Sequence, residues 1–478
     1  MQESFTAHHH FVQPFLHVGL ALQANPALVA PTVNHNMNWG IFKPVEKKFN
    51  QVRKLYNNRK NKRQAIGRPQ KGFGGRQGFD FYGLLRAYIL APLFRIDTNP
   101  ADIHAALYAN PAFLCEVAFR PKQKGRGRTA SIIINPFPSY DVINDFDNIM
   151  TEFGLWEEVR RLCTIHGIEQ GVIPKKIKLG IDPTPIKAAS NPNNKKKRCG
   201  CKDKKRCQHR RTPTDPNAGY YNKGDMVLKS AHRPVILGEL EGGVPLTSFM
   251  LKGNKQMDAA TYQDILAMYK QDPSLNGLKV YGVYADGEFS TEENKALTKE
   301  QLKTRLITPI NPRRRKEISV EAKGIKHINK YGVPVCEQNH KFTYRGRDYL
   351  RDAYIWSSPR EEKGGNLCWV CPSPCTSSKG GRLFRVSRDD VPWVDWSLPE
   401  FSYRFKLEMA LRTEMERIIS RLKYLCGMKG LTKRGKKKAQ SFVTRAIIVA
   451  QVVGIVAHKL KGRYVLRRIR TFPLPIAA

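Results

Sequence analysis

The chain has 478 residues, enough for two or three domains with a sizeable core. Lysine and arginine number 82 against 41 aspartate and glutamate, and this formal charge of +41 repels itself in a compact fold unless a polyanion is bound. Nucleic acid is the polyanion that fits best, and the length and the 10% aromatic content argue against a ribosomal or histone-like protein. The longest apolar run, Ala446 to Ala457, is too short for a bilayer, so we expect no membrane partner.

No basic stretch precedes apolar residues at the N-terminus, so we expect no signal peptide. The ten cysteines are clustered, which indicates thiolates in a reducing compartment. We therefore expect a cytoplasmic protein associated with the nucleoid.

The first third of the sequence predicts a basic leader followed by helices. Residues 1–66 are expected to form a basic, partly disordered region, in which the basic, glycine-rich stretch 47–76 favours a linker. Helical periodicity begins at Phe81 and returns near Ile103 and Val142. These elements predict a helical DNA-binding domain over 67–170.

After Pro174 the pattern takes the period of a strand. Residues 177–181 alternate apolar and polar, and the strand is expected to stop at Asp182, because Pro183 cannot continue a central strand. Residues 278–285 predict a second buried strand that ends at Asp286. Between them, 234–251 predicts a hairpin and 258–270 a helix. The pattern indicates an α/β fold with a mixed sheet flanked by helices.

An amphipathic helix is predicted over 411–425, with Leu411, Met415, Ile418, Leu422 and Leu425 along one apolar stripe. At about 100° per residue, Arg412, Glu416 and Lys423 fall on one flank beside it. On its own this pattern is typical of a solvated ladder of ion pairs.

Two acids at strand ends change that interpretation. Asp182 and Asp286 could meet at one sheet edge, where a divalent cation would offset their repulsion. Carboxylate oxygens suit Mg²⁺ or Mn²⁺, and Glu416 would be the third ligand. Two such ions about 4 Å apart support phosphodiester chemistry. Alone, each aspartate is more simply a turn or capping residue.

These residues resemble the DDE transposases of bacterial insertion sequences. The resemblance rests on Gly180-Ile181-Asp182-Pro183-Thr184, on Val283-Tyr284-Ala285-Asp286-Gly287, and on Arg412, Glu416 and Lys423 at the spacing of a Tyr-x₂-Arg-x₃-Glu-x₆-Lys signature. The tyrosine position holds Met409, which is a departure from that signature. Further similarity includes Thr214-Asp215-Pro216-Asn217-Ala218 and covers most of 67–460.

The resemblance implies an RNase H-like core with a β-rich insertion between the second aspartate and the glutamate. It implies metal-dependent cleavage at transposon ends and joining of the freed 3′-OH to target DNA. Asp182, Asp286 and Glu416 would be the metal ligands, and Arg412 and Lys423 would contact DNA phosphates. Pairing two ends implies a homodimer on double-stranded DNA.

Other basic residues are candidates for DNA contact. Thr184 and Lys187 follow the first aspartate, and a basic loop over 429–438 follows the predicted helix. Within that loop we expect Lys433, Arg434 and Lys436 to contact DNA, although a solvated charge run is the simpler alternative. The helix after the loop, to about Lys461, is apolar enough to be buried core.

Two cysteine clusters are candidates for structural Zn²⁺. The first, inside a basic run, consists of Cys199, Cys201, Cys207 and His209; a basic loop with incidental cysteines is the alternative. The second consists of Cys336, Cys368, Cys371 and Cys375, with His340 as an alternative ligand.

The expected regions are 1–66, 67–170, a core from 171–310 and 400–465, a β-rich insertion over 311–399 with a zinc site, and a tail over 466–478. Two alternatives to a transposase stay open: a metal-dependent nuclease on the same core, and a zinc-containing nucleic-acid-binding protein without catalysis.

Overall fold

The computed structural model describes residues 26–64, 80–119, 138–190, 214–255, 258–358 and 381–461, apart from 224–225, 312, 314 and 323, together with short pieces at 122–124, 131–133 and between 371 and 378. The chain forms two compact units. Unit 1 comprises Met1–Gln256, Gln263–Tyr281 and Glu414–Ala478. Unit 2 comprises Met257–Tyr262 and Gly282–Thr413.

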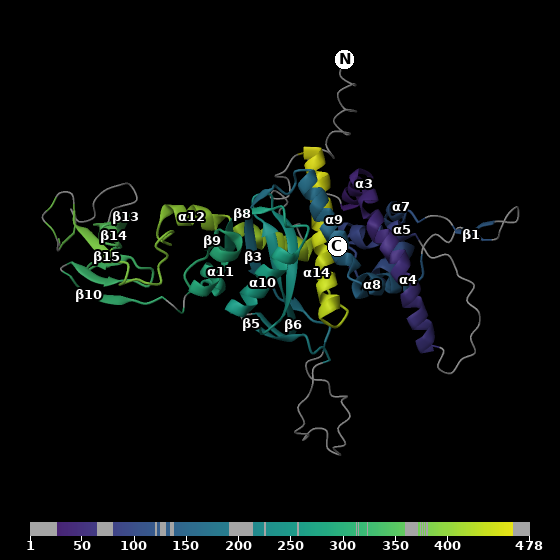
Figure 1. Cartoon of the computed structure of the whole chain (residues 1–478), viewed down its shortest axis with the longest axis horizontal. Helices are drawn as coiled ribbons and strands as arrows, with labels where there is room; N and C mark the ends of the chain where they lie inside the picture. The colour runs from purple at the N-terminus through teal and green to yellow at the C-terminus, as the bar shows by residue number, and fades with distance from the viewer. Residues whose placement is uncertain are drawn as a thin grey trace, which may run out of the picture. The chain divides into compact units, whose positions relative to one another are not determined.

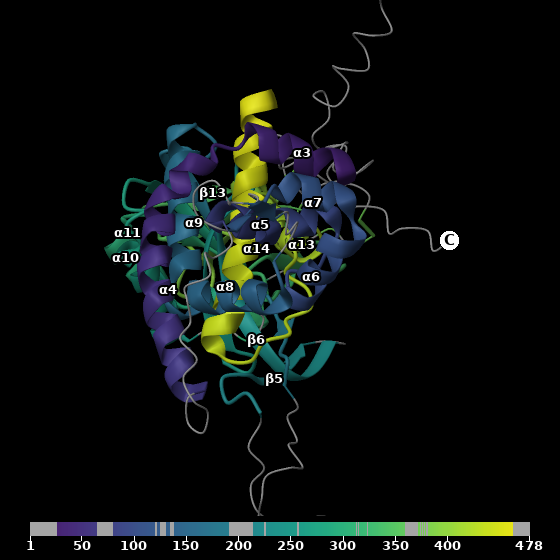
Figure 2. The ribbon, with the colours of Figure 1, turned by 90° about the vertical axis from the view of Figure 1, so that its right-hand side faces the viewer.

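Unit 1 contains a layer of helices around an aromatic core. Phe49, Phe81, Tyr88, Phe146 and Trp156 lie with ring centroids 5.1–5.9 Å apart where they contact one another. Figure 2 shows these helices grouped around α14. The helices are α3 (Pro26–Asn36), η1 (Trp39–Phe42), α4 (Lys43–Gln64), α5 (Phe81–Leu90), η2 (Ala91–Phe94), α6 (Pro100–Ala109), α7 (Pro111–Val117), α8 (Tyr140–Glu152) and α9 (Leu155–Glu169).

Helix α4 corrects the expectation of a basic linker. Val45, Phe49, Val52 and Tyr56 recur at helical spacing, and Val45 and Phe49 are buried. This apolar stripe packs α4 on α8 and α9, so residues 47–64 are helical rather than a linker.

The seven-stranded sheet has the order β4-β6-β3-β8-β9, with β5 and β7 also paired to β6. Strand β6 is antiparallel to β3 and β7, whereas β8 and β9 are parallel. Strand β8 begins in unit 1 and ends in unit 2. The strands are β3 (Lys176–Pro183), β4 (Ile186–Lys187), β5 (Gly219–Lys223), β6 (Met226–Glu239), β7 (Val244–Lys252), β8 (Lys279–Ala285) and β9 (Arg305–Ile307). The protein is therefore a mixed α/β protein, as the sequence pattern predicted.

Strand β3 runs further than its sequence predicted. Asp182 pairs with Ile236, and Pro183 pairs with Val235, so both belong to the ladder. Pro183 is tolerated because it is the last residue of the strand.

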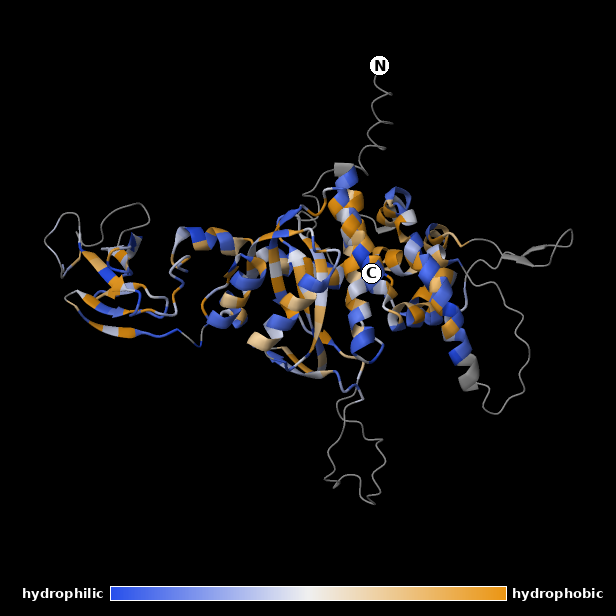
Figure 3. Cartoon of the chain, in the orientation of Figure 1, coloured by the Kyte–Doolittle hydropathy of each residue, from blue (hydrophilic) through white to orange (hydrophobic). Residues whose placement is uncertain are grey.

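The remaining helices all come after strand β7 in the chain. Helix α14 packs on β7 and α9, and Figure 3 shows its apolar character along most of its length. Segment Lys436–Lys459 is long and apolar enough to cross a membrane, but 94% of its most apolar window is buried inside the fold, as in a core helix. The helices are α10 (Ala259–Gln271), η4 (Gly287–Phe289), α11 (Glu292–Leu302), α12 (Tyr403–Ala410), α13 (Thr413–Tyr424) and α14 (Lys436–Lys461).

Unit 2 contains two three-stranded antiparallel sheets within the stretch 311–399 (Figure 1). One buried cluster joins them, because Ile325, Ile328 and Cys336 from the first sheet share a core with Tyr354, Trp356 and Val386 from the second. The strands are β10 (Ile318–Ala322), β11 (Ile325–Ile328), β12 (Pro334–Cys336), β13 (Thr343–Asp348), β14 (Ala353–Ser357) and β15 (Leu383–Ser387).

Candidate catalytic and nucleic-acid-binding site

The helix that carries Glu416 is shorter than predicted. The chain leaves α12 after Ala410 and starts α13 at Thr413, whose hydroxyl donates to the Ala410 carbonyl at 2.7 Å. Arg412 therefore precedes the helix and belongs to unit 2, while Glu416 and Lys423 lie on α13 in unit 1. Met415, Ile418 and Leu422 are buried as the stripe required.

Helix α13 lies on the sheet at a pair of glycines. Gly180 of β3 and Gly238 of β6 are directly paired. A Cβ at position 180 would collide with Met415, and one at position 238 would lie 2.8 Å from Ile418 Cδ1. Because neither glycine has a side chain, α13 can approach closely the strand that carries Asp182.

Asp182 and Lys423 lie within electrostatic reach of each other. Asp182 is half-buried at the end of β3, and the Lys423 ammonium is half-buried on α13. Partial burial lowers the pKa of Lys423; the Asp182 carboxylate opposes that shift and Lys429 adds to it. Glu416, which lies in the first turn of α13, is exposed.

Asp286 occupies the strand end that its sequence predicted. It follows β8 in unit 2 and caps η4, since its carboxylate accepts from the Gly287 amide at 2.6 Å. It is half-buried.

The donor chemistry of Asp182, Asp286 and Glu416 fits a hard divalent cation, because all three offer carboxylate oxygens and none is fully buried. Over the described residues, no three histidine, cysteine, aspartate or glutamate side chains are grouped closely enough to hold a metal ion.

Only part of the predicted zinc ligands can be placed. Cys199, Cys201, Cys207, His209, Cys368 and Cys375 lie outside the described residues. Cys336 and His340 flank a tight turn, in which the His340 amide donates to Cys336 Sγ at 3.4 Å. Cys371 is half-buried.

The basic loop after α13 is fastened to the segment that follows Asp182. Arg434 donates from Nε to the Ala189 carbonyl at 2.8 Å, just beyond Lys187 of β4. The Gly435 amide donates to Asp215 Oδ2 at 2.8 Å. The helix begins at Lys436, so Lys436 belongs to the first turn of α14 rather than to the loop, and its side chain is exposed.

Lys433 is anchored inside unit 1. Its ammonium donates to Asp147 Oδ2 at 2.6 Å, and Arg445 pairs with the same carboxylate. Trp156 Nε1 donates to Asp147 Oδ1 at 3.0 Å. Thr184 is also buried, with its amide bonded to the Pro234 carbonyl, whereas Lys187 is exposed. These contacts give Lys433 and Thr184 a structural role.

Two buried polar pairs were not predicted from the sequence. Glu414 pairs with Arg421 at 2.9 Å, and Arg421 donates to the Gly243 carbonyl, which holds α13 to the β6–β7 hairpin. The i,i+7 spacing of that pair was the available signal. His232 and Asp215 are fully buried and lie 3.1 Å apart, from Nε2 to Oδ2.

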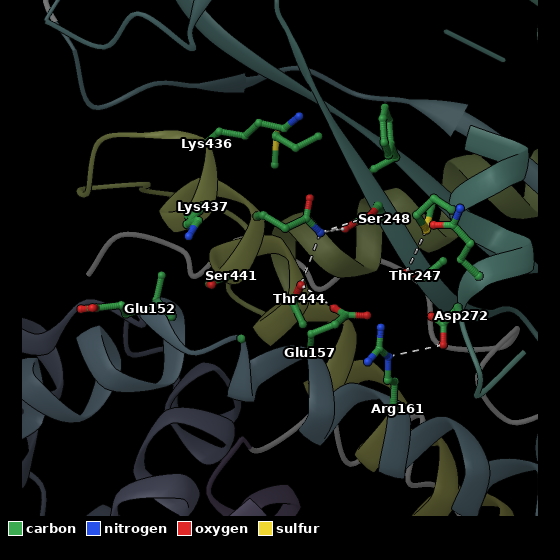
Figure 4. A pocket seen from close by; sticks show the side chains of 17 residues that line it. Glu152, Glu157, Arg161, Thr247, Ser248, Asp272, Lys436, Lys437, Ser441 and Thr444 are labelled. Carbon is green, nitrogen blue, oxygen red and sulfur yellow. Dashed lines mark hydrogen bonds and ion pairs between the residues drawn. The ribbon is translucent and has the colours of Figure 1, made fainter. Parts of the chain in front are cut away.

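A groove of 690 Å³ lies on unit 1 beside strand β7 (Figure 4). Its polar wall includes Arg161 with Asp272, and Gln440, whose amide donates to the Ser248 carbonyl at 3.1 Å. Lys436 is the one predicted site residue that lines it. The groove is therefore distinct from the surroundings of Asp182.

Neither the models of known protein families nor the curated proteins searched contain a match to this chain.

Proposed function

We propose that the protein is a DDE-type DNA transposase, which cleaves the ends of its element and joins the 3′-OH to target DNA. The proposal takes Asp182, Asp286 and Glu416 as the ligands of Mg²⁺ or Mn²⁺, and double-stranded DNA as the substrate. It takes the sheet as RNase H-like, with β7-β6-β3-β8-β9 as its strand order.

One observation carries the proposal. The glycine pair lets α13 pack on β3 and β6, so the helix that bears Glu416 lies on the strand that carries Asp182, and the Asp182 carboxylate acts electrostatically on Lys423. A half-buried carboxylate and a half-buried cation near a strand end suit phosphoryl transfer, which depends mainly on positioning and charge stabilisation.

In this proposal the acidic side chains bind metal ions and the basic side chains bind DNA phosphates. The carboxylates of Asp182, Asp286 and Glu416 would hold the metal ions, which when bound activate the attacking oxygen and stabilise the leaving one. Lys423 would bind a phosphate beside the cleaved bond, with Arg412 as a second cation. Lys187 and Arg434 would hold the flanking DNA backbone, since Lys187 lies in β4 and Arg434 lies in the loop that is hydrogen-bonded to Ala189 just after it.

The test compares wild type with Asp182→Asn and Glu416→Gln on a labelled duplex that carries the element's own end. We expect Mg²⁺-dependent cleavage by wild type only, with DNA binding nearly unchanged, because each variant loses a ligand and keeps its shape. Glu300→Gln is the matched control, since Glu300 is an exposed helical acid in unit 2. It should cleave like wild type.

Cleavage by either site variant at the wild-type rate would refute the three-acid site. A supercoiled target added to the cleaved end separates the alternatives, because a transposase joins the two DNAs and a nuclease does not. Tight binding without cleavage, unaffected by chelation of Mg²⁺, would favour the non-catalytic nucleic-acid-binding protein.

A further inference from the structure

Helix α4 has two sharply different faces. At about 100° per residue, its packing face carries Val45, Phe49, Val52 and Tyr56. The opposite face carries three lysines, three asparagines and one glutamine, all exposed: Lys43, Lys47, Asn50, Gln51, Lys54, Asn57 and Asn58. Among the described side chains on this outer face there is no acid.

The helix is held firmly along its flank. Lys48 pairs with Glu158 of α9, and Arg59 pairs with Glu152 of α8 at 3.0 Å. The Phe49 ring packs at a tilt against Phe81 and Phe146 in the aromatic core. Figure 2 shows α4 along the outside of the helical layer of unit 1, so its outer face is presented on a rigid support.

The composition of this outer face is poor for helix stability. Asparagine is a weak helix former, and Lys43 and Lys47 repel each other at i,i+4. Over the whole helix, nine lysines and arginines stand against one acid, Glu46, which gives a net charge of 9 − 1 = +8. Neither feature helps α4 fold, so both are better explained by what the face binds.

We propose that the outer face of α4 lies in the major groove of duplex DNA and reads its sequence. This deepens the proposed function by naming the surface that recognises the element's ends, and it rests on that function for the identity of the DNA. Asparagine and glutamine can each bond an adenine edge through two hydrogen bonds, and the lysines would contact the flanking phosphates.

The dimensions of α4 agree with this role. From Lys43 to Asn58 the helix is about 22 Å long at about 1.5 Å per residue. A helix about 10–12 Å across enters the major groove of B-DNA, which is about 12 Å wide. The deep, narrow major groove of A-form RNA does not admit side chains. A membrane-inserting helix needs an apolar stripe on its exposed side, whereas this polar face is bordered only by the exposed side chains of Leu55 and Pro44.

The experiment selects duplexes that the full-length protein prefers from a pool with a randomised 20-bp core, and measures binding by fluorescence anisotropy. Asn50→Ala with Asn57→Ala changes no charge and improves helix propensity. We expect this variant to lose at least 10-fold of the preference for the selected duplex over a scrambled one, while its affinity for the scrambled duplex stays within 2-fold.

Lys47→Ala with Lys54→Ala should instead weaken binding to both the selected and the scrambled duplex. It should also lower the salt slope of binding by about 2, one unit per phosphate contact. The matched control, Lys270→Ala with Lys299→Ala, removes two exposed lysines from α10 and α11. It should leave the discrimination unchanged.

Three outcomes would overturn the inference: unchanged discrimination in the asparagine variant, no sequence preference by wild type, or equal competition by an RNA duplex. Mg²⁺-dependent cleavage of the selected duplex is scored separately. If the Asn50→Ala, Asn57→Ala variant still discriminates between the selected and the scrambled duplex, α4 does not recognise the sequence. If wild type nevertheless cleaves the selected duplex, the proposed function stands.

Discussion

Asp147 is a buried acid between two cations, and its environment gives it a testable link to stability. Burial alone would raise the pKa of its carboxyl, but Arg445 and Lys433, with hydrogen bonds from Lys433 and Trp156, hold that pKa below its usual value. The charged pair joins α8 to the loop before α14 and to α14 itself. A group of this kind contributes stability only while it is ionised.

Asp147→Asn should lower the free energy of unfolding by about 3–5 kcal/mol, because it leaves the buried Arg445 and the half-buried Lys433 without a counter-charge. The folded-state pKa lies below the unfolded value of about 3.9, so the contribution is present above that pH and is lost as the pH falls through the folded-state pKa. Thermal unfolding at pH 7 and near pH 3 measures both effects. The gap between wild type and the variant should shrink in acid, and a gap that grows would contradict the assignment.

Cys426 should resist thiol reagents in the folded protein. Burial raises the pKa of its thiol to about 12, so almost no thiolate exists at pH 8, and the side chain is covered. Cys115 is exposed and should react before Cys426. Mass spectrometry after brief alkylation, with and without denaturant, distinguishes the two. Equally fast native labelling of both would show that the segment just after α13 opens readily.

At the scale of elements, periodicity predicted those whose patterns are decided locally. Strands β3 and β8, helix α10 and core helix α14 all appear where alternation or helical spacing placed them. The basic composition of 47–64 is typical of a linker, but the apolar residues Val45, Phe49, Val52 and Tyr56 recur at helical spacing, and their packing makes α4 a helix. The break before Thr413 was not predictable, because tertiary packing, not the apolar pattern, separates α12 from α13.

The close packing of α13 on Gly180 gives a prediction about the stability and position of this helix. Gly180→Ala should destabilise the protein by about 1–3 kcal/mol and displace α13, since its new methyl group would collide with Met415 and lie 2.5 Å from Leu240 Cδ2. Cleavage should fall more than DNA binding does. Gly277→Ala is the control, because nothing lies within 4 Å of a Cβ there, and it should stay within about 0.5 kcal/mol of wild type.

At the scale of the whole molecule, the charge of +41 predicts strong salt dependence. If 6–10 phosphates are neutralised, affinity for any duplex should fall about 10³- to 10⁵-fold between 50 and 200 mM salt. Titrations over that range give the slope directly. A nearly flat slope would mean that the basic surface serves another partner, and the same titrations on a heparin surface would then show whether polyanions bind at all.

Helix α14 has a consequence for how the protein is made. It leaves the ribosome after the strands that it covers, and about 200 residues separate Val244 of β7 from Lys461. At a synthesis rate of about 5–20 residues per second, about 10–40 s pass between the synthesis of β7 and that of the end of α14, which packs on it. Until then, the apolar face of β7 is without the helix that buries it, and a chain truncated before residue 436 lacks that helix altogether. Chains truncated in this way should therefore aggregate rather than fold.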